Sequence, residues 1–439
     1  MIKFYFFITL LIYYSICYIS IPFKRKFEDE INYDNIFNIL LNNNLETNIE
    51  LGTPPQEITV SLNFRDYAIF IKNTSFNKIT SDSFKNVEDP YDDYNDYFDE
   101  EIENPYKKKK EAELSNDVLF LDNKKVKIEN INFLIYNKTK EKANGFIGFN
   151  LYPNSDIQKF SNLIEQLKVN KIIDSYYFFI KYTNDNEGNL ILGNTPHEIY
   201  KNNYLINNFY FKHLKRHYES DSYHFSSNFD KIIFENDTKD LCNIEFSLEN
   251  GMIKTSNSFS KILEKYFIKY INENICFKIE KNSNFFYYCK KNIAKNFPSL
   301  IFQINQTKTK FELTGKDLFY KFNNNYYLLL LYYDKQYNNN WILGKPFLKK
   351  YLIVFNQDQV TFGYYSKFNN NNKNYLFSLS FLIHIFSFII ILGLLSYIFI
   401  FLKKKLKKNR ANELDENYEY ISENNTQFIQ LNTKTNKNF

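Results

Sequence analysis

Two long apolar runs bracket a chain whose interior alternates between short apolar and polar stretches. The first run, residues 1–20, reads MIKFYFFITLLIYYSICYIS and is followed by the basic residues Lys24, Arg25 and Lys26. A lysine before an apolar run and a polar, basic start after it are typical of a signal peptide. The run ends without a clean small-x-small cleavage site, so an uncleaved anchor is the alternative. We predict a signal peptide over residues 1–20.

The second run predicts a transmembrane helix. It covers Leu376–Leu402, 27 residues with no Asp, Glu, Lys or Arg and with a single histidine, His384. At 1.5 Å per residue such a helix is about 40 Å long, enough to cross a hydrocarbon core of about 30 Å with some tilt. Six lysine and arginine residues follow between positions 403 and 410. By the positive-inside bias, residues 403–439 are then cytosolic, and the body of the chain faces the lumen of the endoplasmic reticulum or a later secretory membrane.

Between these runs, the pattern predicts a mostly β protein with small helices. Apolar residues recur every three and four positions over Ile157–Lys168 and Phe259–Ile271, which predicts a helix at each place. Elsewhere, short runs of β-branched and aromatic residues predict strands. Examples are Glu57–Leu62, Val118–Leu121, Tyr176–Ile180, Leu328–Tyr333 and Tyr351–Phe355.

The composition supports a large core and excludes several classes of protein. The chain is 44% hydrophobic and 24% charged, which rules out wholesale disorder and a small disulfide scaffold. Its net charge of +5 is not gathered into a basic domain, so we expect no nucleic-acid partner. Residues 88–110 form an insertion in which nine acidic residues precede four lysines. We interpret the insertion as a solvated loop, with a clasp for a basic partner as the alternative.

Cysteine and histidine usage argues against a metal site. The sequence contains neither a Cys-x-x-Cys pair nor a Cys/His cluster at zinc spacing, and its five histidines are scattered. We therefore expect no metal and no cofactor. Cys276 and Cys289 flank a polar-then-aromatic stretch that suits a hairpin stapled at its base, which leaves Cys242 as an odd thiol.

Five short motifs follow one another along the chain: Glu50–Gln56 (ELGTPPQ), Asn144–Phe149 (NGFIGF), Asn186–Gly193 (NEGNLILG), Trp341–Tyr351 (WILGKPFLKKY) and Val360–Gly363 (VTFG). In this order they resemble the landmarks of the pepsin-like aspartic protease family (peptidase A1), over about residues 45–365. The resemblance implies a mostly β, bilobal fold. It divides the chain into a short pre-domain segment (21–44), an N-terminal lobe (45–200), a C-terminal lobe (201–366) and an Asn-rich linker (367–375) before the transmembrane helix.

Three features narrow the resemblance: the C-terminal anchor, the short pre-domain segment and the Cys276/Cys289 pair. By these features the chain resembles, within the family, the membrane-anchored plasmepsin V-like proteins of apicomplexan parasites. The resemblance implies a monomer that is held to a membrane by its C-terminal helix and that takes a peptide or protein ligand in a cleft between two lobes.

The first catalytic motif of the family is degenerate in this sequence. Enzymes of the family hold two carboxylates that share one proton, so that one acts as a base on water and the other as an acid. Family spacing puts the first aspartate at Asn63, where Asn63-Phe64-Arg65 replaces Asp-Thr-Gly. Asn63 cannot ionise, Phe64 lacks a hydroxyl, and Arg65 carries a Cβ where glycine is usual. Asp66 substitutes for Asn63 only if the register slips by three residues.

The second motif is assigned to Glu249-Asn250-Gly251, which keeps a carboxylate and the glycine. One glutamate opposite one asparagine is not a proton-sharing pair. The expected flap falls near Tyr106, the candidate substrate-binding residue, where four lysines replace the family's glycines. We therefore expect a pseudoprotease that binds a peptide or partner without cutting it. The alternatives are a divergent endopeptidase that uses Glu249 with Asp66 or with an unrecognised carboxylate, and a structural or chaperone-like component with a closed cleft.

Four Asn-x-Ser/Thr sequons are candidates for glycosylation if the body of the chain is lumenal. They begin at Asn73, Asn137, Asn236 and Asn305.

Overall fold

The structure is a computed structural model that describes residues 18–26, 36–64, 66–87, 112–122, 125–136, 143–150, 162–215, 225–255, 257–281, 284–333, 340–366, 387 and 393–404. The chain forms two compact units, residues 1–369 and 370–439. In the second unit, residues 393–404 are helical and exposed. Among the described residues, no helix combines the length and the apolar content that crossing a membrane requires. Most of the transmembrane segment expected at 376–402 lies outside the described residues.

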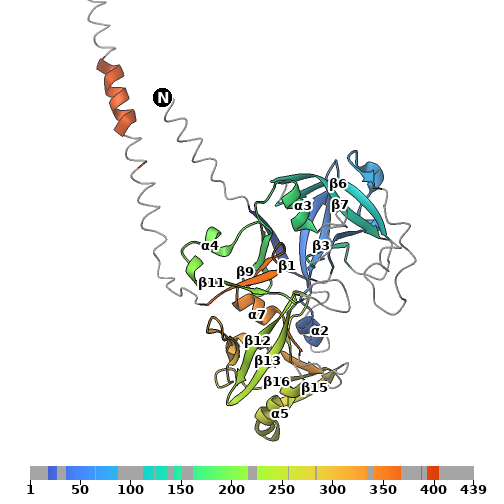
Figure 1. The fold of residues 1–439 in the computed structure, drawn as a ribbon, viewed down its shortest axis with the longest axis vertical. Coiled ribbons are helices and arrows are strands. Elements are labelled where there is room, and N and C mark those ends of the chain that lie inside the picture. Colours follow the sequence, from blue (N-terminus) through green and yellow to red (C-terminus); the bar gives the residue numbers. More distant parts are fainter. Residues whose placement is uncertain are drawn as a thin grey trace, which may run out of the picture. The chain divides into compact units, whose positions relative to one another are not determined.

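The first unit is built on two sheets, which confirms the expectation of a mostly β protein (Figure 1). The larger sheet has 13 strands in the order β11-β24-β23-β9-β10-β1-β2-β3-β8-β4-β7-β6-β5. Its strands are β1 (Ile19–Arg25), β2 (Leu45–Leu51), β3 (Gln56–Asn63), β4 (Ile69–Lys72), β5 (Lys85–Asn86), β6 (Ala112–Leu121), β7 (Val126–Tyr136), β8 (Gly145–Gly148), β9 (Tyr177–Tyr182), β10 (Glu187–Leu192), β11 (Phe209–His213), β23 (Val354–Asn356) and β24 (Thr361–Tyr365).

The second sheet has 11 strands, all from the C-terminal half of the unit. They are β12 (Ser226–Phe234), β13 (Asp237–Phe246), β14 (Ile253–Thr255), β15 (Cys276–Lys281), β16 (Asn284–Cys289), β17 (Leu300–Ile304), β18 (Thr309–Leu313), β19 (Phe319–Phe322), β20 (Asn325–Leu328), β21 (Leu330–Tyr333) and β22 (Asn340–Leu343). The last strands of the chain, β23 and β24, return to the first sheet, where β23 pairs with β9. The two halves are thereby tied together by backbone hydrogen bonds.

The helices are few and short, apart from α5. They are α2 (Ile36–Leu41), α3 (Leu163–Val169), α4 (Pro196–Ile199), α5 (Asn257–Asn272), α6 (Gly315–Leu318) and α7 (Lys345–Lys350), with 3-10 turns η1 (Asn73–Ser75), η2 (Lys78–Thr80) and η6 (Ile206–Asn208). The helix expected over Phe259–Ile271 is confirmed as α5, which buries Phe259, Leu263 and Phe267 on one face. Of the helix expected over Ile157–Lys168, α3 supplies the second half, and residues 157–161 are not described.

The beginning of the described chain is part of the folded body. Strand β1 lies inside the larger sheet between β10 and β2, and buries Ile19, Ile21 and Phe23 in alternation. Helix α2 packs Ile36 and other apolar residues against the C-terminal half. Residues 21–44, expected as a separate pre-domain segment, thus supply a strand and a helix to the body. Strand β1 also includes the last two residues of the expected signal peptide, 19 and 20; the rest of that segment up to 17 is not described.

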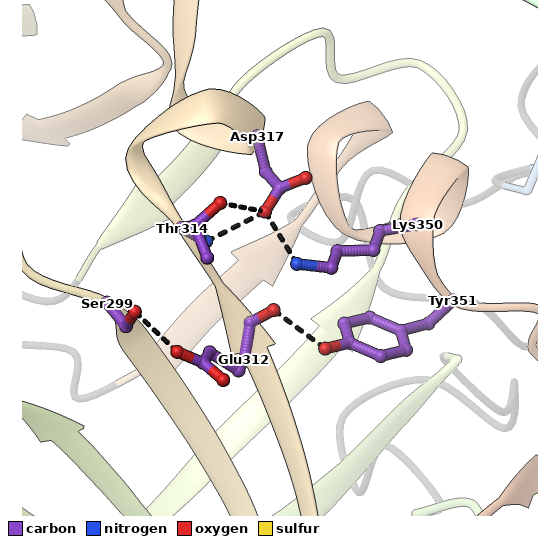
Figure 2. Close-up of polar contacts among 6 residues, drawn as sticks. All are labelled: Ser299, Glu312, Thr314, Asp317, Lys350 and Tyr351. Atoms are coloured by element: carbon purple, nitrogen blue, oxygen red, sulfur yellow. Dashed lines mark hydrogen bonds and ion pairs between the residues drawn. The ribbon is translucent and has the colours of Figure 1, made fainter. Parts of the chain in front are cut away.

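Helix α7 follows the crossing strand β22 and is fixed by polar contacts from α6 and β18 (Figure 2). The Asp317 carboxylate accepts hydrogen bonds from the backbone N–H and the hydroxyl of Thr314, at 2.7 and 2.8 Å. It also forms an ion pair with the Lys350 amine at 2.6 Å. The Tyr351 hydroxyl donates to the carbonyl of Glu312 at 2.7 Å, and the Glu312 side chain accepts from Ser299. These contacts fix the C-terminal end of α7 against α6 and β18.

Candidate functional site

In the N-terminal half, a short strand passes between the two strands that enter and leave the first candidate loop. Strand β8 pairs in parallel with β3 and antiparallel with β4. Leu62 at the end of β3 and Ile69 at the start of β4 both pair with Ile147 of β8. The loop between them therefore has six residues, and Asn63 is the first of these.

The C-terminal half repeats this arrangement. Strand β22 pairs in parallel with β13 and antiparallel with β14. Phe246 pairs with Leu343, and Lys254 pairs with Ile342, so Ile253 is level with Leu343. Six residues again separate the two strands, and the first of them is Ser247.

A glycine follows the pairing point in each half, and each is needed there. A Cβ on Gly148 would lie 2.1 Å from the carbonyl oxygen of Asp66. A Cβ on Gly344 would lie 2.3 Å from the carbonyl oxygen of Asn250. Backbone atoms cannot approach a Cβ so closely, so only glycine lets the loop cross the strand. Asp66 and Asn250 are each the fourth residue of their loop. The contacts of the two glycines therefore align the two loops residue by residue in the same way as the strand registers do.

The alignment changes the assignment of the second catalytic position. Asn63 corresponds to Ser247, the first residue of the other loop, and not to Glu249, which comes two residues later. The sequence-based assignment to Glu249 relied on matching Gly251 to the glycine of the family motif, but Gly251 has a different role in the structure. A Cβ on Gly251 would lie 2.2 Å from the carbonyl oxygen of Leu40, so this glycine makes room for α2. By register, the two equivalent loop positions hold an asparagine and a serine.

Asn63 is engaged within its own loop. Its side-chain nitrogen donates to a carboxylate oxygen of Asp66 at 2.9 Å, and its side-chain oxygen accepts from the Asp66 backbone N–H at 3.0 Å. Both side chains are half-buried. The Asn63 amide thus closes a tight turn and orients the Asp66 carboxylate. The register slip that would put Asp66 in the place of Asn63 does not occur, because Leu62 and Ile69 both pair with Ile147.

Glu249 reaches from the second loop to the first. One of its carboxylate oxygens accepts the backbone N–H of Phe64 at 2.6 Å, and the other accepts the hydroxyl of Ser247 at 2.6 Å. The Ser247 oxygen in turn accepts from the Asn250 side chain at 2.6 Å. Hydrogen bonds to a carboxylate are among the stronger ones in proteins. The Glu249 side chain therefore links the two candidate loops directly.

The second residue of each loop is apolar and buried. Phe64 is 4% exposed and Leu248 is fully buried. The Phe64 ring lies 4.4 Å from that of Phe225 and 5.1 Å from that of Phe355, between centroids. Where the family motif has a threonine, this chain has two side chains that belong to its hydrophobic core.

The segment that follows α2 completes the polar network. The Asn43 side chain donates to the carbonyl of Leu248 at 2.8 Å and to the hydroxyl of Tyr182 at 2.9 Å. Its backbone N–H donates to the carbonyl of Glu249 at 2.7 Å. The Gly251 N–H donates to the Leu41 carbonyl at 2.8 Å. Sequence reasoning missed Asn43, because it lay in a segment that was expected to precede the body.

The residue after each crossing glycine differs in chemistry. Phe149 follows Gly148, is fully buried, and stacks on Phe178 at 5.3 Å between centroids. Lys345 follows Gly344 and is 9% exposed. Burial lowers the pKa of Lys345 to about 7, the positive charge of Arg25 lowers it too, and Asp185 opposes the shift. The C-terminal half thus buries an amine where the N-terminal half buries a ring.

The other predicted site residues have mixed outcomes. The disulfide between Cys276 and Cys289 is confirmed, and it joins directly paired residues of β15 and β16. Cys242 is a free, buried thiol whose pKa burial raises to about 11. Asn73, Asn236 and Asn305 are exposed. Tyr106, Asn137, Arg65 and the whole of the insertion 88–110 lie outside the described residues. Within the part of the chain that is described, no group of three or more His, Cys, Asp or Glu side chains is placed to hold a metal ion.

Comparison with known proteins identifies the family. The model of the eukaryotic aspartyl protease family matches residues 113–366, more than half of the chain. The match includes the second loop and both crossing strands, and it begins after the first loop. A search of curated proteins found no match. The duplicated strand crossings and this match show that the chain belongs to the eukaryotic aspartyl protease family.

Proposed function

We propose that this chain is a catalytically inactive aspartic protease, a pseudoprotease that binds a peptide or protein partner between its lobes without cleaving it. One observation carries the proposal: the first residues of the two loops, equivalent by register, are Asn63 and Ser247. Neither side chain ionises near neutral or acidic pH, so the pair cannot share a proton or activate a water as two aspartates do.

The carboxylates near these positions support the same proposal. Glu249 accepts the Phe64 N–H and the Ser247 hydroxyl, so both of its oxygens hold the loops together. Asp66 accepts from Asn63 and comes from the fourth position of its loop. If this chain were active, Glu249 and Asp66 would have to do the work of the two family aspartates, although neither is the first residue of its loop.

A divergent endopeptidase is the second candidate. The observation in its favour is that Asp66 and Glu249 both contact residues 63–64, so two carboxylates lie at the junction of the loops. If they shared a proton, one could act as base and the other as acid.

Cleavage of a denatured protein by the purified full-length chain, followed from pH 3 to 7 as release of acid-soluble peptides, distinguishes the two. We expect no turnover and no binding of a pepstatin-like inhibitor. Turnover that disappears in both Glu249→Ala and Asp66→Ala would establish the endopeptidase instead.

Restoration variants test the alignment itself. Asn63→Asp combined with Ser247→Asp puts carboxylates at the two equivalent positions, whereas Asn63→Asp with Glu249→Asp follows the sequence-based assignment. We expect inhibitor binding to increase in the first variant and not in the second. The reverse result would return the catalytic position to Glu249.

We further propose that the protein is a single-pass type I membrane protein of the secretory pathway, similar to the plasmepsin V-like enzymes in its anchor. The apolar runs at both ends of the chain carry this proposal, and the disulfide and the three exposed sequons agree with a lumenal body. Alkaline carbonate extraction should leave the full chain in the membrane fraction. Treatment with a glycosidase should lower its apparent mass, and replacing Asn73, Asn236 and Asn305 by Gln should remove that shift.

A further inference from the structure

Four exposed apolar side chains lie close together in the sequence around the edge strand β11. In the first unit, ten of the described residues are large, hydrophobic and exposed, and four of these are within seven residues of each other. We call these four the exit patch: Leu205, Ile206, Tyr210 and Phe211, which are 47%, 66%, 37% and 42% exposed. Isolated exposed apolar residues are common, but a cluster of them marks an interaction surface.

The exit patch surrounds an edge of the larger sheet. Strand β11 is the last strand at one end of that sheet and pairs with β24. Phe211 stacks on Tyr177 at 6.1 Å and contacts Phe209, while Tyr210 lies beside Tyr364, which places the two exposed rings on opposite faces of the strand. Ile206 begins η6 and Leu205 precedes it, just before the strand; β11 is labelled in Figure 1. The four exposed side chains thus belong to the edge strand and to the turn that leads into it.

The chain leaves the first unit at the same edge. Ser366, which follows β24, donates its backbone N–H to the carbonyl of Asn208 at 2.9 Å. Only residues 367–375 separate it from the apolar run that begins at Leu376. Nine residues span at most about 30 Å when fully extended. If residues 376–402 cross a bilayer, the length of this linker limits how far that bilayer can be from the exit patch.

The chemistry of the exit patch suits the interface of a bilayer. Tyrosine is favoured at the level of lipid headgroups, where its ring meets both an apolar and a wet environment. Phenylalanine and leucine side chains insert into the boundary between headgroups and acyl chains. Tyr200 and Tyr204 lie next to the patch in sequence and are partly exposed. Lys201, Lys212 and Lys215 add positive charge in the same stretch of sequence, and lysines near a membrane surface are attracted to anionic lipids.

We propose that the exit patch rests in the interfacial layer of the membrane that the C-terminal helix crosses, so that the body is held against the bilayer at β11. This inference depends on the membrane anchoring proposed above and is independent of whether the protein cleaves peptides.

Tryptophan quenching in lipid nanodiscs tests the proposal on the full-length chain. Trp341 is the single tryptophan, is fully buried, and gives a constant background. Ile206→Trp places a second tryptophan in the exit patch, and Leu241→Trp places one at a matched exposed site on β13, 73% exposed against 66%. With nitroxide-labelled headgroups in a phosphatidylcholine bilayer, we expect quenching at residue 206 to exceed that at residue 241 by at least threefold. Tyr210→Trp is a second reporter in case Ile206→Trp does not fold.

Each other outcome overturns the proposal in a recognisable way. Equal quenching at residues 206, 210 and 241, in a chain that resists carbonate extraction, overturns the membrane contact and leaves the anchoring intact. Release of the chain by carbonate overturns both. Disulfide cross-linking between two copies through Phe211→Cys, together with weak quenching, assigns the exit patch to a second copy of this chain instead of to lipid.

Discussion

The two candidate catalytic loops share their geometry and differ in their chemistry. Each loop has six residues and joins two strands that both pair with one short strand, β8 in the first half and β22 in the second. Each short strand is followed or ended by a glycine that lies against the loop, Gly148 in one half and Gly344 in the other. Their side chains keep no such likeness: the first loop begins Asn63-Phe64, and the second begins Ser247-Leu248. The strand crossing and the proteolytic chemistry therefore depend on different residues. The crossing is kept in this chain, although the residues for the chemistry are absent.

The difference extends to what replaces the catalytic motif. Phe64 and Leu248 pack into the hydrophobic core, and Glu249 joins the loops through hydrogen bonds. These residues stabilise the junction of the two halves. Substitutions at these positions distinguish the contacts on which the shared geometry depends.

The largest effect is expected from the crossing glycines. In Gly344→Ala the new Cβ would lie 2.3 Å from the Asn250 carbonyl oxygen and 2.4 Å from that of Met252, and both are backbone atoms that cannot rotate away. We expect a loss of about 4 kcal/mol or more in the free energy of unfolding, or failure to fold. Urea unfolding in detergent measures the loss. Gly393→Ala is the matched control, since nothing lies within 4 Å of its Cβ. Equal stability of the two variants would contradict the role given to the crossing.

The next effect concerns the buried second residue of each loop. Phe64→Ala and Leu248→Ala each remove a core side chain, and we expect each to cost about 3 kcal/mol in unfolding free energy. Phe64→Thr, which restores the residue of the family motif, should cost nearly as much because the hydroxyl would lie among the rings of Phe178, Phe225 and Phe355. Thermal unfolding of the three variants provides the comparison. A Phe64→Thr variant as stable as the parent would mean that the loop has kept room for the catalytic motif.

Much of this fold could be predicted from the sequence, since local signals encode it. Alternation and β-branched runs predicted β3 and β9, helical periodicity predicted α5, and the glycine motifs marked both crossing strands. The strand expected over Tyr351–Phe355 begins only at Val354, because α7 extends to Lys350. The parts that failed depend on long-range contacts. Strand β1 pairs with β10 more than 160 residues away, and no local pattern reveals that partner.

The site was harder to predict than the fold for the same reason. Gly251 matched the spacing of the family motif, although its backbone is packed against Leu40 of α2. The hydrogen bond from Phe64 to Glu249 joins residues 185 positions apart. One signal could have found Ser247: Leu62 and Ile69, like Phe246 and Ile253, are seven residues apart, which aligns the loops without any glycine.

The buried amine after the second crossing gives a pH-dependent test. Lys345 has a pKa of about 7 in the folded protein, against an ordinary value of 10.5. Between these two values the unfolded chain binds the proton and the folded protein does not, so this group makes the protein more stable as the pH rises from 7 to 10.5. Below pH 7 its unfavourable contribution is complete. The charged groups around it are Arg25, Asp185 and Lys349.

Lys345→Met should therefore stabilise the protein at pH 6, by about 3 kcal/mol, and the gain should disappear near pH 10.5. Urea unfolding at pH 6, 8 and 10 measures it. Lys316→Met, at an exposed position on α6, should change stability by no more than about 0.5 kcal/mol at each pH. A gain at residue 345 that is independent of pH would show that apolar packing, and not the charge, is responsible.

The smallest effect is expected from the carboxylate that joins the loops. Glu249→Ala removes both acceptors and leaves the Phe64 N–H without its partner, which should cost about 2 kcal/mol. Glu249→Gln keeps one oxygen for that N–H and should cost about 1 kcal/mol or less. Glu280→Ala, at an exposed position on β15, is the control and should cost less than about 0.5 kcal/mol. If Glu249→Ala proved as stable as this control, the link between the loops would contribute nothing to stability. Glu249 would then be better explained as a carboxylate retained for chemistry, and the divergent endopeptidase would become the favoured interpretation.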